Sequence, residues 1–399
     1  MTRVSTAQGF DSSLQQLQRR QAELTESQQQ LTTGKRVNRA SDDPTAAARA
    51  ERALASVSKV EATKRGVEAS RTVMTQTESS LGDAGELLQR ARELLVAAGS
   101  GANGDAQRQS IAVDLRGIRN QLLAVANRND GADGYLFGGQ GSSQAPFIDA
   151  PGGVQFAGTA GQSQVAGREQ LPISLDGGAT WLAGRTGNGV FETRVIASNG
   201  SAWIDAGSVV APASLTGSTY RLQFTNTAGA VTYSVLRDGA ATAQANVAYS
   251  PGTAIQIDGM AVAVSGTPAN GDDFELRPST STLSVFGMLD KAVADLSAGG
   301  KRSAQITQDS VMNLRNIDQS MARLSTARSD VGGTLNRIDS VNDSLDSLKL
   351  QGQTERSSAE DLDMLQAISE FQNKQSGYDA ALKSYSMVQR LSLFQYLNT

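Results

Sequence analysis

A seven-residue repeat of apolar side chains runs through both ends of this chain and restricts its possible folds more than any other feature. In the N-terminal part, six apolar residues spaced by seven run from Val60 to Leu95. Beyond the middle of the chain, five more run from Ile317 to Leu345. A period of 3.5 residues that persists over several heptads is typical of helices that wind around one another. We therefore expect long helices in a coiled coil or long bundle, with several separate amphipathic helices as the alternative.

The middle of the chain has a different composition. Seven of the eight prolines lie between Pro146 and Pro278, and 27 of the 40 glycines lie between Gly131 and Gly300. Proline breaks helix interiors and glycine weakens them, so this region should consist of β structure and loops.

Alternating apolar and polar residues predict β-hairpins in this middle region. The predicted strands are residues 220–224, 231–235, 255–257, 260–264 and 273–277. Asp258-Gly259, between the third and fourth of these strands, is a strong two-residue hairpin turn. Residues from about 150 to 215 are too rich in glycine and alanine for a strand register to be assigned.

Capping residues and glycines predict where the helices end. Residues 41–44 place Ser and Asp side chains before a proline suited to the first helical turn. One helix should therefore end near Gly34 and the next should begin near Asp43. After a glycine-rich turn, Asp105 should begin a helix that returns antiparallel. Gly352 should divide the two C-terminal helices.

These observations predict an α+β protein. A long antiparallel helical coiled coil or bundle is built from both termini, and an antiparallel β domain is inserted between its halves. With 399 residues, the chain is too long for one ordinary core. The expected parts are an N-terminal assembly helix, half of a helical rod, the β domain, the other half of the rod and a C-terminal assembly helix. Their boundaries, in that order, are 1–40, 41–140, 141–280, 281–350 and 351–399.

The composition argues against several classes of function. The chain has no His and no Cys, which excludes disulfides, thiolate chemistry, Cys/His zinc sites and an imidazole base. Its net charge of −4 provides no electrostatic footprint for nucleic acid. No apolar run approaches a membrane span, and we expect no cleaved signal peptide. No phosphate loop or nucleophile elbow is complete, so we expect no enzyme, no catalytic residue, no metal and no cofactor.

The terminal helices have too few apolar side chains to be stable alone. Between residues 8 and 30 the chain has eight glutamines. Two of them, Gln21 and Gln28, occupy positions of the seam, which is the side of the helix that should face its partner helix. Burying a leucine is worth about 1.5–3 kcal/mol, whereas ordering each residue of backbone costs roughly 1–2 kcal/mol. We therefore expect both ends to become ordered when they meet each other and neighbouring copies, with an ordinary intramolecular bundle as the alternative. The predicted assembly interface comprises Phe10, Leu14, Leu17, Leu24, Leu31, Met364, Ile368, Phe371, Tyr378, Leu382 and Tyr385.

Several stretches resemble the flagellin superfamily. These are the Arg-Val-Ser-Thr of residues 3–6, residues 31–44, the Gly-Tyr-Leu-Phe-Gly-Gly of residues 134–139, and residues 381–394. The start and the ending are similar to those of the hook-associated members that join hook to filament. Residues 252–278 are similar to a segment of hook-associated proteins. The likeness covers both flanks of the chain, residues 1–140 and 281–399.

The resemblance implies a structural role outside the cell. The chain would leave the cytoplasm through the flagellar type III apparatus and become part of the extracellular flagellum. Its implied partners are further copies of itself, flagellin, another hook-associated protein on the hook side, and a cytoplasmic export chaperone that holds the C-terminal region. Neither nucleic acid nor membrane is among them.

Two other functions remain open. The chain could be flagellin itself, although residues 3–6 lack flagellin's usual start and residues 360–364 keep only part of its Arg-x-Glu-Asp-Ala-Asp run. A more remote alternative is a secreted adhesin or cell-wall hydrolase, for which paired carboxylates such as Asp272-Asp273 would have to lie in a cleft.

Overall fold

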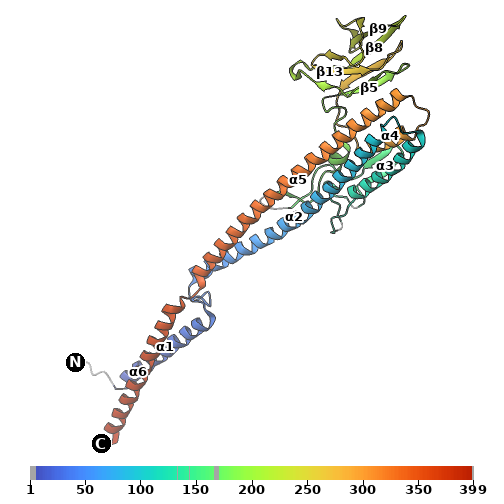
Figure 1. The fold of residues 1–399 in the computed structure, drawn as a ribbon. Helices are drawn as coiled ribbons and strands as arrows, with labels where there is room; N and C mark the ends of the chain where they lie inside the picture. The colour runs from blue at the N-terminus through green and yellow to red at the C-terminus, as the bar shows by residue number, and fades with distance from the viewer. Residues whose placement is uncertain (1–5, 133, 143, 166–169, 398–399) are drawn as a thin grey trace. The chain divides into compact units, whose positions relative to one another are not determined.

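The computed structural model describes residues 6–132, 134–142, 144–165 and 170–397. They form six α-helices, with β-strands between the third and the fourth (Figure 1). The helices are α1 (Thr6–Thr33), α2 (Pro44–Ala98), α3 (Asp105–Ala126), α4 (Val285–Ser297), α5 (Ser303–Glu360) and α6 (Met364–Leu397). The chain divides into two compact units, residues 1–65 with 341–399 and residues 66–340, and the division falls within α2 and α5. The predicted α+β class, with helical termini around an antiparallel β insertion, is confirmed.

The seven-residue repeats form the buried side of the long helices. In α2, every member of the series is less than one-tenth exposed: Val60, Val67, Met74, Leu81, Leu88 and Leu95. In α5 the same holds for Ile317, Leu324, Val331, Ile338 and Leu345. The period therefore identified the residues that these helices bury.

Ion pairs between α2 and α5 show that the two helices run antiparallel in a constant register. In the larger unit, Arg71 pairs with Asp339 at 3.0 Å and Arg92 with Asp318 at 2.7 Å. In the other unit, Lys64 pairs with Asp346 at 2.7 Å. Exposed pairs of this kind contribute little to stability. They lie beside the apolar seam, whose burial supplies the larger part of the free energy.

The predicted helix break at Gly352 is wrong. Helix α5 continues through this residue to Glu360. A Cβ atom at position 352 would lie 2.8 Å from Cγ2 of Val57, so the glycine allows α2 and α5 to approach closely. The chain breaks instead at residues 361–363, where Asp363 Oδ1 accepts hydrogen bonds from the backbone N–H groups of Leu365 and Gln366 and caps α6.

The first part of the β region packs with the shorter helices. It contains β1 (Phe147–Ala150), β2 (Gly153–Phe156), β3 (Gln164–Val165), β4 (Leu171–Pro172) and a short π-helix (Gly178–Leu182). Trp181 is fully buried and stacks on Phe286 of α4, with ring centroids 5.8 Å apart. Phe137 meets Trp181 edge-on at 5.4 Å, so the Gly-Tyr-Leu-Phe-Gly-Gly stretch of residues 134–139 contributes to this core.

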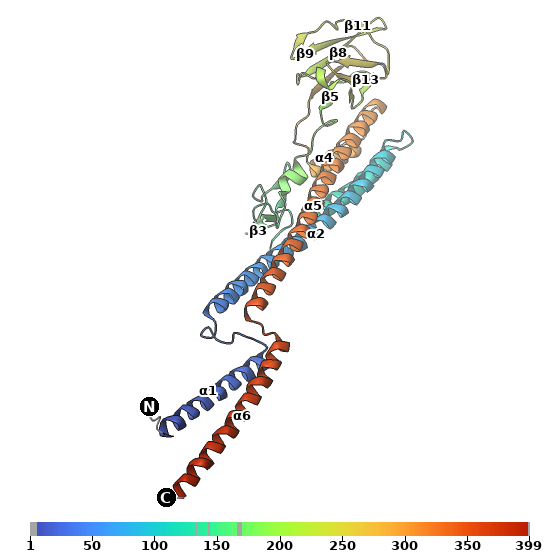
Figure 2. The same cartoon turned by 90° about the vertical axis from the view of Figure 1, so that its left-hand side faces the viewer.

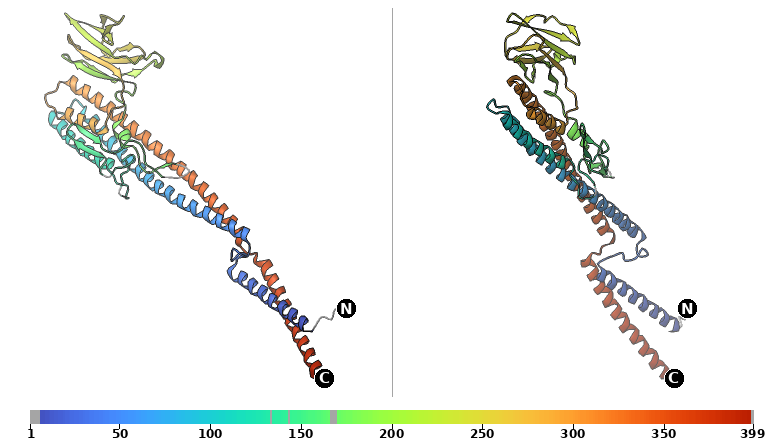
Figure 3. Two further views of the ribbon diagram at one scale, coloured as in Figure 1. Left: turned by 180° about the vertical axis from the view of Figure 1, so that it is seen from behind. Right: turned by 90° about the vertical axis from the view of Figure 1, so that its right-hand side faces the viewer.

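Helix α4, which the sequence did not predict as a separate element, lies beside α3 (Figures 1 and 3). Arg119 of α3 connects the two helices to β1. Its side chain is 7% exposed, and it donates to Asp290 of α4 at 3.1 Å and to Asp149 of β1 at 2.6 Å. The Arg119 guanidinium lowers the pKa of the Asp149 carboxyl. These two contacts of the buried guanidinium with half-exposed carboxylates position the start of the β region against the helices.

The second part of the β region is a two-sheet sandwich. Its strands are β5 (Phe191–Ala197), β6 (Trp203–Ile204), β7 (Ser208–Val209), β8 (Tyr220–Thr227), β9 (Ala230–Arg237), β10 (Ala240–Ala241), β11 (Val247–Ala248), β12 (Ala254–Ile257), β13 (Met260–Ser265) and β14 (Asp273–Pro278). One sheet has the order β10-β9-β8-β14-β5, with β11 also on β9. The other has the order β12-β13-β6, with β7 also on β13. Phe224, Phe274 and Val264 are among the buried side chains between them.

Both predicted hairpins are confirmed. Strand β8 pairs with β9, and β12 pairs with β13, in antiparallel register. Asp258 and Gly259 have φ values of 40° and 82°, so both occupy the left-handed region that a two-residue hairpin turn requires.

Replacing Leu88, which is completely buried in the α2 seam, should destabilise the unit of residues 66–340. Leu88→Ala should lower the free energy of unfolding by about 2–5 kcal/mol, because it leaves a cavity as well as removing apolar burial. Chemical denaturation followed by circular dichroism measures this loss. Val113→Ala in α3 is the control, since Val113 is 63% exposed, and its effect should stay within about 0.5 kcal/mol. Equal losses in the two variants would contradict the assignment of the seam.

Candidate assembly interface of the terminal helices

The predicted interface residues lie on α1 and α6, which run side by side within the unit of residues 1–65 and 341–399 (Figures 1 and 2). The chain runs toward the α5–α6 connection in α1 and away from it in α6, so the helices are antiparallel. In this unit they form a separate pair beyond the ends of α2 and α5.

The apolar residues of this pair remain partly or largely exposed. Leu14, Met364, Ile368 and Leu382 are 38–46% exposed. The other predicted members whose side chains are described are half-buried: Leu17, Leu24, Leu31, Phe371, Tyr378 and Tyr385. The side chain of Phe10 lies outside the described residues. The structure thus brings the predicted residues onto one helix pair without burying any of those that it describes.

The one side chain that is buried in this pair, within residues 11–33 and 364–387, is polar. Ser27 is 5% exposed, and its Oγ accepts a hydrogen bond of 2.7 Å from Nζ of Lys374. The stretches 60–95 of α2 and 317–345 of α5 bury a large apolar side chain every seven residues, whereas the apolar residues of α1 and α6 that the structure describes are at most half-buried. The prediction of a sparse seam missed Ser27 and Lys374, although Gln21 and Gln28 at two of the companion positions were a signal for polar contacts.

A joint connects the base of this helix pair to the end of α5. The backbone N–H of Arg36 donates to the carbonyl oxygen of Glu360 at 2.7 Å, and that of Leu362 donates to Gly34 at 3.0 Å. The Arg36 guanidinium also donates to the carbonyl oxygen of Ala359 at 2.9 Å. Gly34, with φ of 69°, supplies the left-handed turn that ends α1.

The Glu360 carboxylate adds charge to this joint. It lies 3.2 Å from Nζ of Lys35 and 2.7 Å from Nε of Arg356, and its side chain is 15% exposed. Residues 34–37 and 359–362 are therefore held together by backbone hydrogen bonds and by a half-buried cluster of charges. Sequence analysis predicted the helix end near Gly34 and the cap at residues 41–44, and it noted the resemblance of residues 31–44 to a family; it did not predict the contact with the end of α5.

Two aspartates shape the loop between α1 and α2. Asp42 Oδ2 accepts hydrogen bonds from the backbone N–H groups of Asn38 and Arg39. Asp43 Oδ1 accepts from the N–H groups of Thr45 and Ala46, which confirms the predicted cap of α2.

The same contacts determine how the Asp43 cap depends on pH. The N–H of Ala46, the Thr45 hydroxyl and the Arg36 guanidinium lower the pKa of the Asp43 carboxyl to about 2. Because the folded-state pKa is depressed, the stabilisation by the cap is fully present above the ordinary pKa and is lost as the pH falls toward 2.

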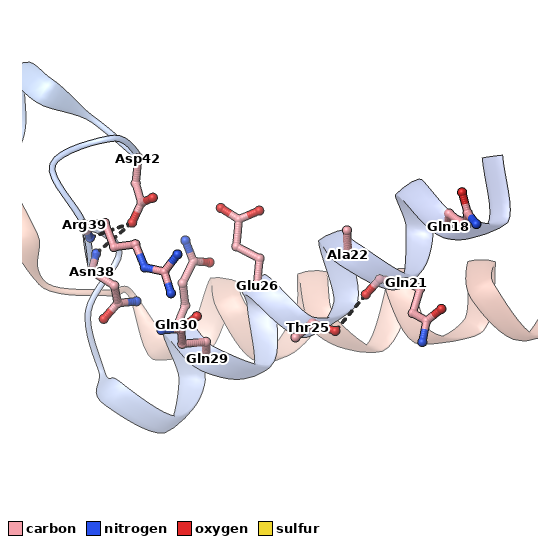
Figure 4. A pocket seen from close by; sticks show the side chains of 10 residues that line it. All are labelled: Gln18, Gln21, Ala22, Thr25, Glu26, Gln29, Gln30, Asn38, Arg39 and Asp42. Atoms are coloured by element: carbon pink, nitrogen blue, oxygen red, sulfur yellow. Dashed lines mark hydrogen bonds between the residues drawn. The ribbon is translucent and has the colours of Figure 1, made fainter. Parts of the chain in front are cut away.

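A shallow groove of about 600 Å³ lies between α1 and the loop of residues 38–42 (Figure 4). It is lined almost entirely by polar side chains: Gln18, Gln21, Ala22, Thr25, Glu26, Gln29, Gln30, Asn38, Arg39 and Asp42. Such a lining suits water and polar side chains and lacks the apolar walls of a typical small-molecule site.

The described residues hold no cluster of three or more His, Cys, Asp or Glu side chains able to bind a metal ion. Asp272 and Asp273, the carboxylate pair considered for a hydrolase, make internal contacts. Asp272 accepts hydrogen bonds from the backbone of Asn199 and Gly200, and Asp273 pairs with Arg221. Among the helices that the structure describes, none is long and apolar enough to cross a bilayer.

Comparison with known proteins relates these helices to two described regions. The bacterial flagellin N-terminal helical region matches residues 4–142, and the bacterial flagellin C-terminal helical region matches residues 314–397. Together the two matches cover more than half of the chain.

Individual proteins match to different extents. The flagellar hook-associated protein 3 of Escherichia coli is 27% identical over 98% of this chain and 99% of its own length. The crystal structure of the flagellar junction protein FlgL from Legionella pneumophila is 25% identical, with a TM-score of 0.66 over 71% of this chain and 97% of that one. The flagellar filament 41 kDa core protein of Borreliella burgdorferi is 26% identical over 31% of this chain and 37% of its own.

Removal of the Arg36 side chain should loosen the joint. Arg36→Ala loses the donor to Ala359 and the 3.2 Å ion pair with Asp43. A protease without arginine specificity should then cut residues 34–43 roughly tenfold faster, because local opening costs less free energy. Arg39→Ala is the matched control: Arg39 is exposed, and its hydrogen bond to Asp42 comes from the backbone. Wild-type cutting rates in both variants would show that the Arg36 contacts do not hold the joint.

Proposed function

This chain belongs to the flagellin family, and from that premise we propose that it is a structural subunit of the bacterial flagellum that joins hook to filament. The observation that carries the proposal is the end-to-end match to a hook-associated protein, which includes the β region. A match to a filament protein is confined to about a third of the chain. The relatives are flagellar structural proteins, so the function proposed is assembly rather than catalysis.

We propose that assembly uses the pairing of α1 with α6 and the apolar residues that the pair leaves exposed. Leu14, Met364, Ile368 and Leu382 each retain 38–46% of their exposure in the single chain. Burying that remainder against neighbouring copies would contribute roughly 1 kcal/mol per side chain. Several such contacts, repeated in every copy, would order helices whose own seam is sparse.

The proposed partners follow from this position in the flagellum. Further copies of the chain would form the same layer, flagellin would follow on the filament side, and another hook-associated protein would precede on the hook side. Before assembly, a cytoplasmic chaperone would hold the C-terminal region, and the chain would be exported through the flagellar type III apparatus without a cleaved signal peptide. Terminal helices without a buried apolar seam are consistent with passage in an unfolded state.

Flagellin itself is the alternative, because the two matching regions are those of flagellin. A deletion strain distinguishes the two functions. If the chain is a junction subunit, the strain should make hooks without filaments and release flagellin monomers into the medium. Restoring the gene should restore filaments. A medium that contains no major filament protein would identify the chain as flagellin and contradict the proposed role as a junction subunit.

Substitutions in the apolar residues of α1 and α6 should impair assembly without unfolding the β domain. Leu17→Ala and Leu382→Ala should each reduce filament attachment by about fivefold or more, since a lost contact of about 1 kcal/mol corresponds to a factor of about five in affinity. The measurements are filament counts in cells and the thermal melt of the β domain within the purified full-length chain. Leu350→Ala on α5 is the control, because Leu350 is 65% exposed and lies outside the terminal pair. Equal loss of the thermal transition in all three variants would contradict the proposed role.

A further inference from the structure

The apolar residues of α1 and α6 do not by themselves define how the helices align. Leu17, Leu24 and Leu31 are spaced by seven on α1, and Phe371, Tyr378 and Tyr385 are spaced by seven on α6. Sliding one helix by seven residues, about 10 Å, would bring each apolar residue opposite the next member of the same series. Some feature that does not repeat must therefore distinguish the observed alignment from the slipped ones.

Two contacts have this property, one of Ser27 with Lys374 and one of Arg20 with Gly377. Ser27 accepts a hydrogen bond from Lys374, and the residue seven positions before Ser27 is a cation, Arg20. The Arg20 guanidinium lies over Gly377, where a Cβ atom would be 2.6 Å from its Nη1. No carboxylate among the described residues lies within ion-pair distance of Arg20 or Lys374. Both cations are thus placed by small neighbours rather than by opposite charges.

We propose that Ser27, Lys374, Arg20 and Gly377, here called the register lock, select the alignment of α1 against α6. A slip in one direction would place Arg20 opposite Lys374, and two like charges would meet. A slip in the other direction would place Ser27 opposite Ala381 and Lys374 opposite Gly34, which lies beyond the end of α1. Each slipped alignment therefore loses the hydrogen bond, and one of them adds repulsion.

The joint at Gly34 and Leu362 holds the same helices at their base, so it is the competing determinant of the alignment. The two explanations differ in what a charge reversal does. If the joint alone sets the alignment, changing Arg20 to an acid leaves it unaltered. If the register lock sets it, an acid at position 20 attracts Lys374 and favours the slipped alignment.

Cross-linking measures the alignment directly. The chain has no cysteine, so every thiol is an engineered one. Gln16 and Ala380 line the same pocket between the helices, and the pair Gln16→Cys with Ala380→Cys reports the observed alignment. Asn373→Cys or Met387→Cys, seven residues away on either side, replaces Ala380→Cys to report the two slips. Disulfide formation in purified full-length chain gives the relative yields.

The 16–380 product should exceed the other two by about tenfold or more, which corresponds to 1.4 kcal/mol. In the Arg20→Glu background the 16–373 product should rise at least about tenfold relative to 16–380. Arg19→Glu makes the same change in charge at an exposed position and should leave the ratio unchanged.

Three results would overturn the register lock: equal yields in the parent chain, no cross-link in any pair, or no response to Arg20→Glu. The inference rests on the proposed function for its biological meaning. Its test needs only the purified chain, whereas the junction role is tested in cells, so the failure of one can be told from the failure of the other.

Discussion

Burial of one large apolar side chain in every seven, from Val60 to Leu95 of α2 and from Ile317 to Leu345 of α5, is the interaction on which the rest of this structure depends. Met74, Leu88 and Ile317 are completely buried, and buried residues of this kind recur throughout these two stretches. Each contributes roughly 1.5–3 kcal/mol by leaving water. Because these helices are stable in their own seam, the chain can carry a β insertion at one place and sparsely packed helices at its termini.

The terminal pair of α1 and α6 lacks such burial. It keeps the seven-residue spacing, but the described part of its seam buries a serine instead of a leucine. Backbone hydrogen bonds at the joint hold the base of the pair, and the proposed register lock selects its alignment. These contacts are directional and short in range, so they can determine geometry while contributing little free energy. The apolar surface that remains exposed is then free to contribute to assembly, as the proposed function requires.

The glycines show why local rules predicted some features and missed others. Gly259 was correctly assigned to a turn, because a two-residue hairpin needs a left-handed backbone that the neighbouring sequence already indicates. Gly352 was wrongly assigned to a helix break, because its role depends on Val57, almost three hundred residues away. Helix α4 was missed for a similar reason. Its Phe286 stacks on Trp181 and its Asp290 accepts a hydrogen bond from Arg119, and both partners belong to other elements.

The sequence by itself determined that both terminal regions of the chain are helical. It also determined the buried face of α2 and α5, the cap at Asp43 and the two β-hairpins. All of these depend on periodicity or on neighbours within a few residues. Only the tertiary structure decided that residues 34–37 meet the end of α5, that Lys374 reaches Ser27, and that Phe137, Trp181 and Phe286 share one core. Each of these contacts joins residues distant in the chain, and their geometry arises from how whole elements pack rather than from local preference.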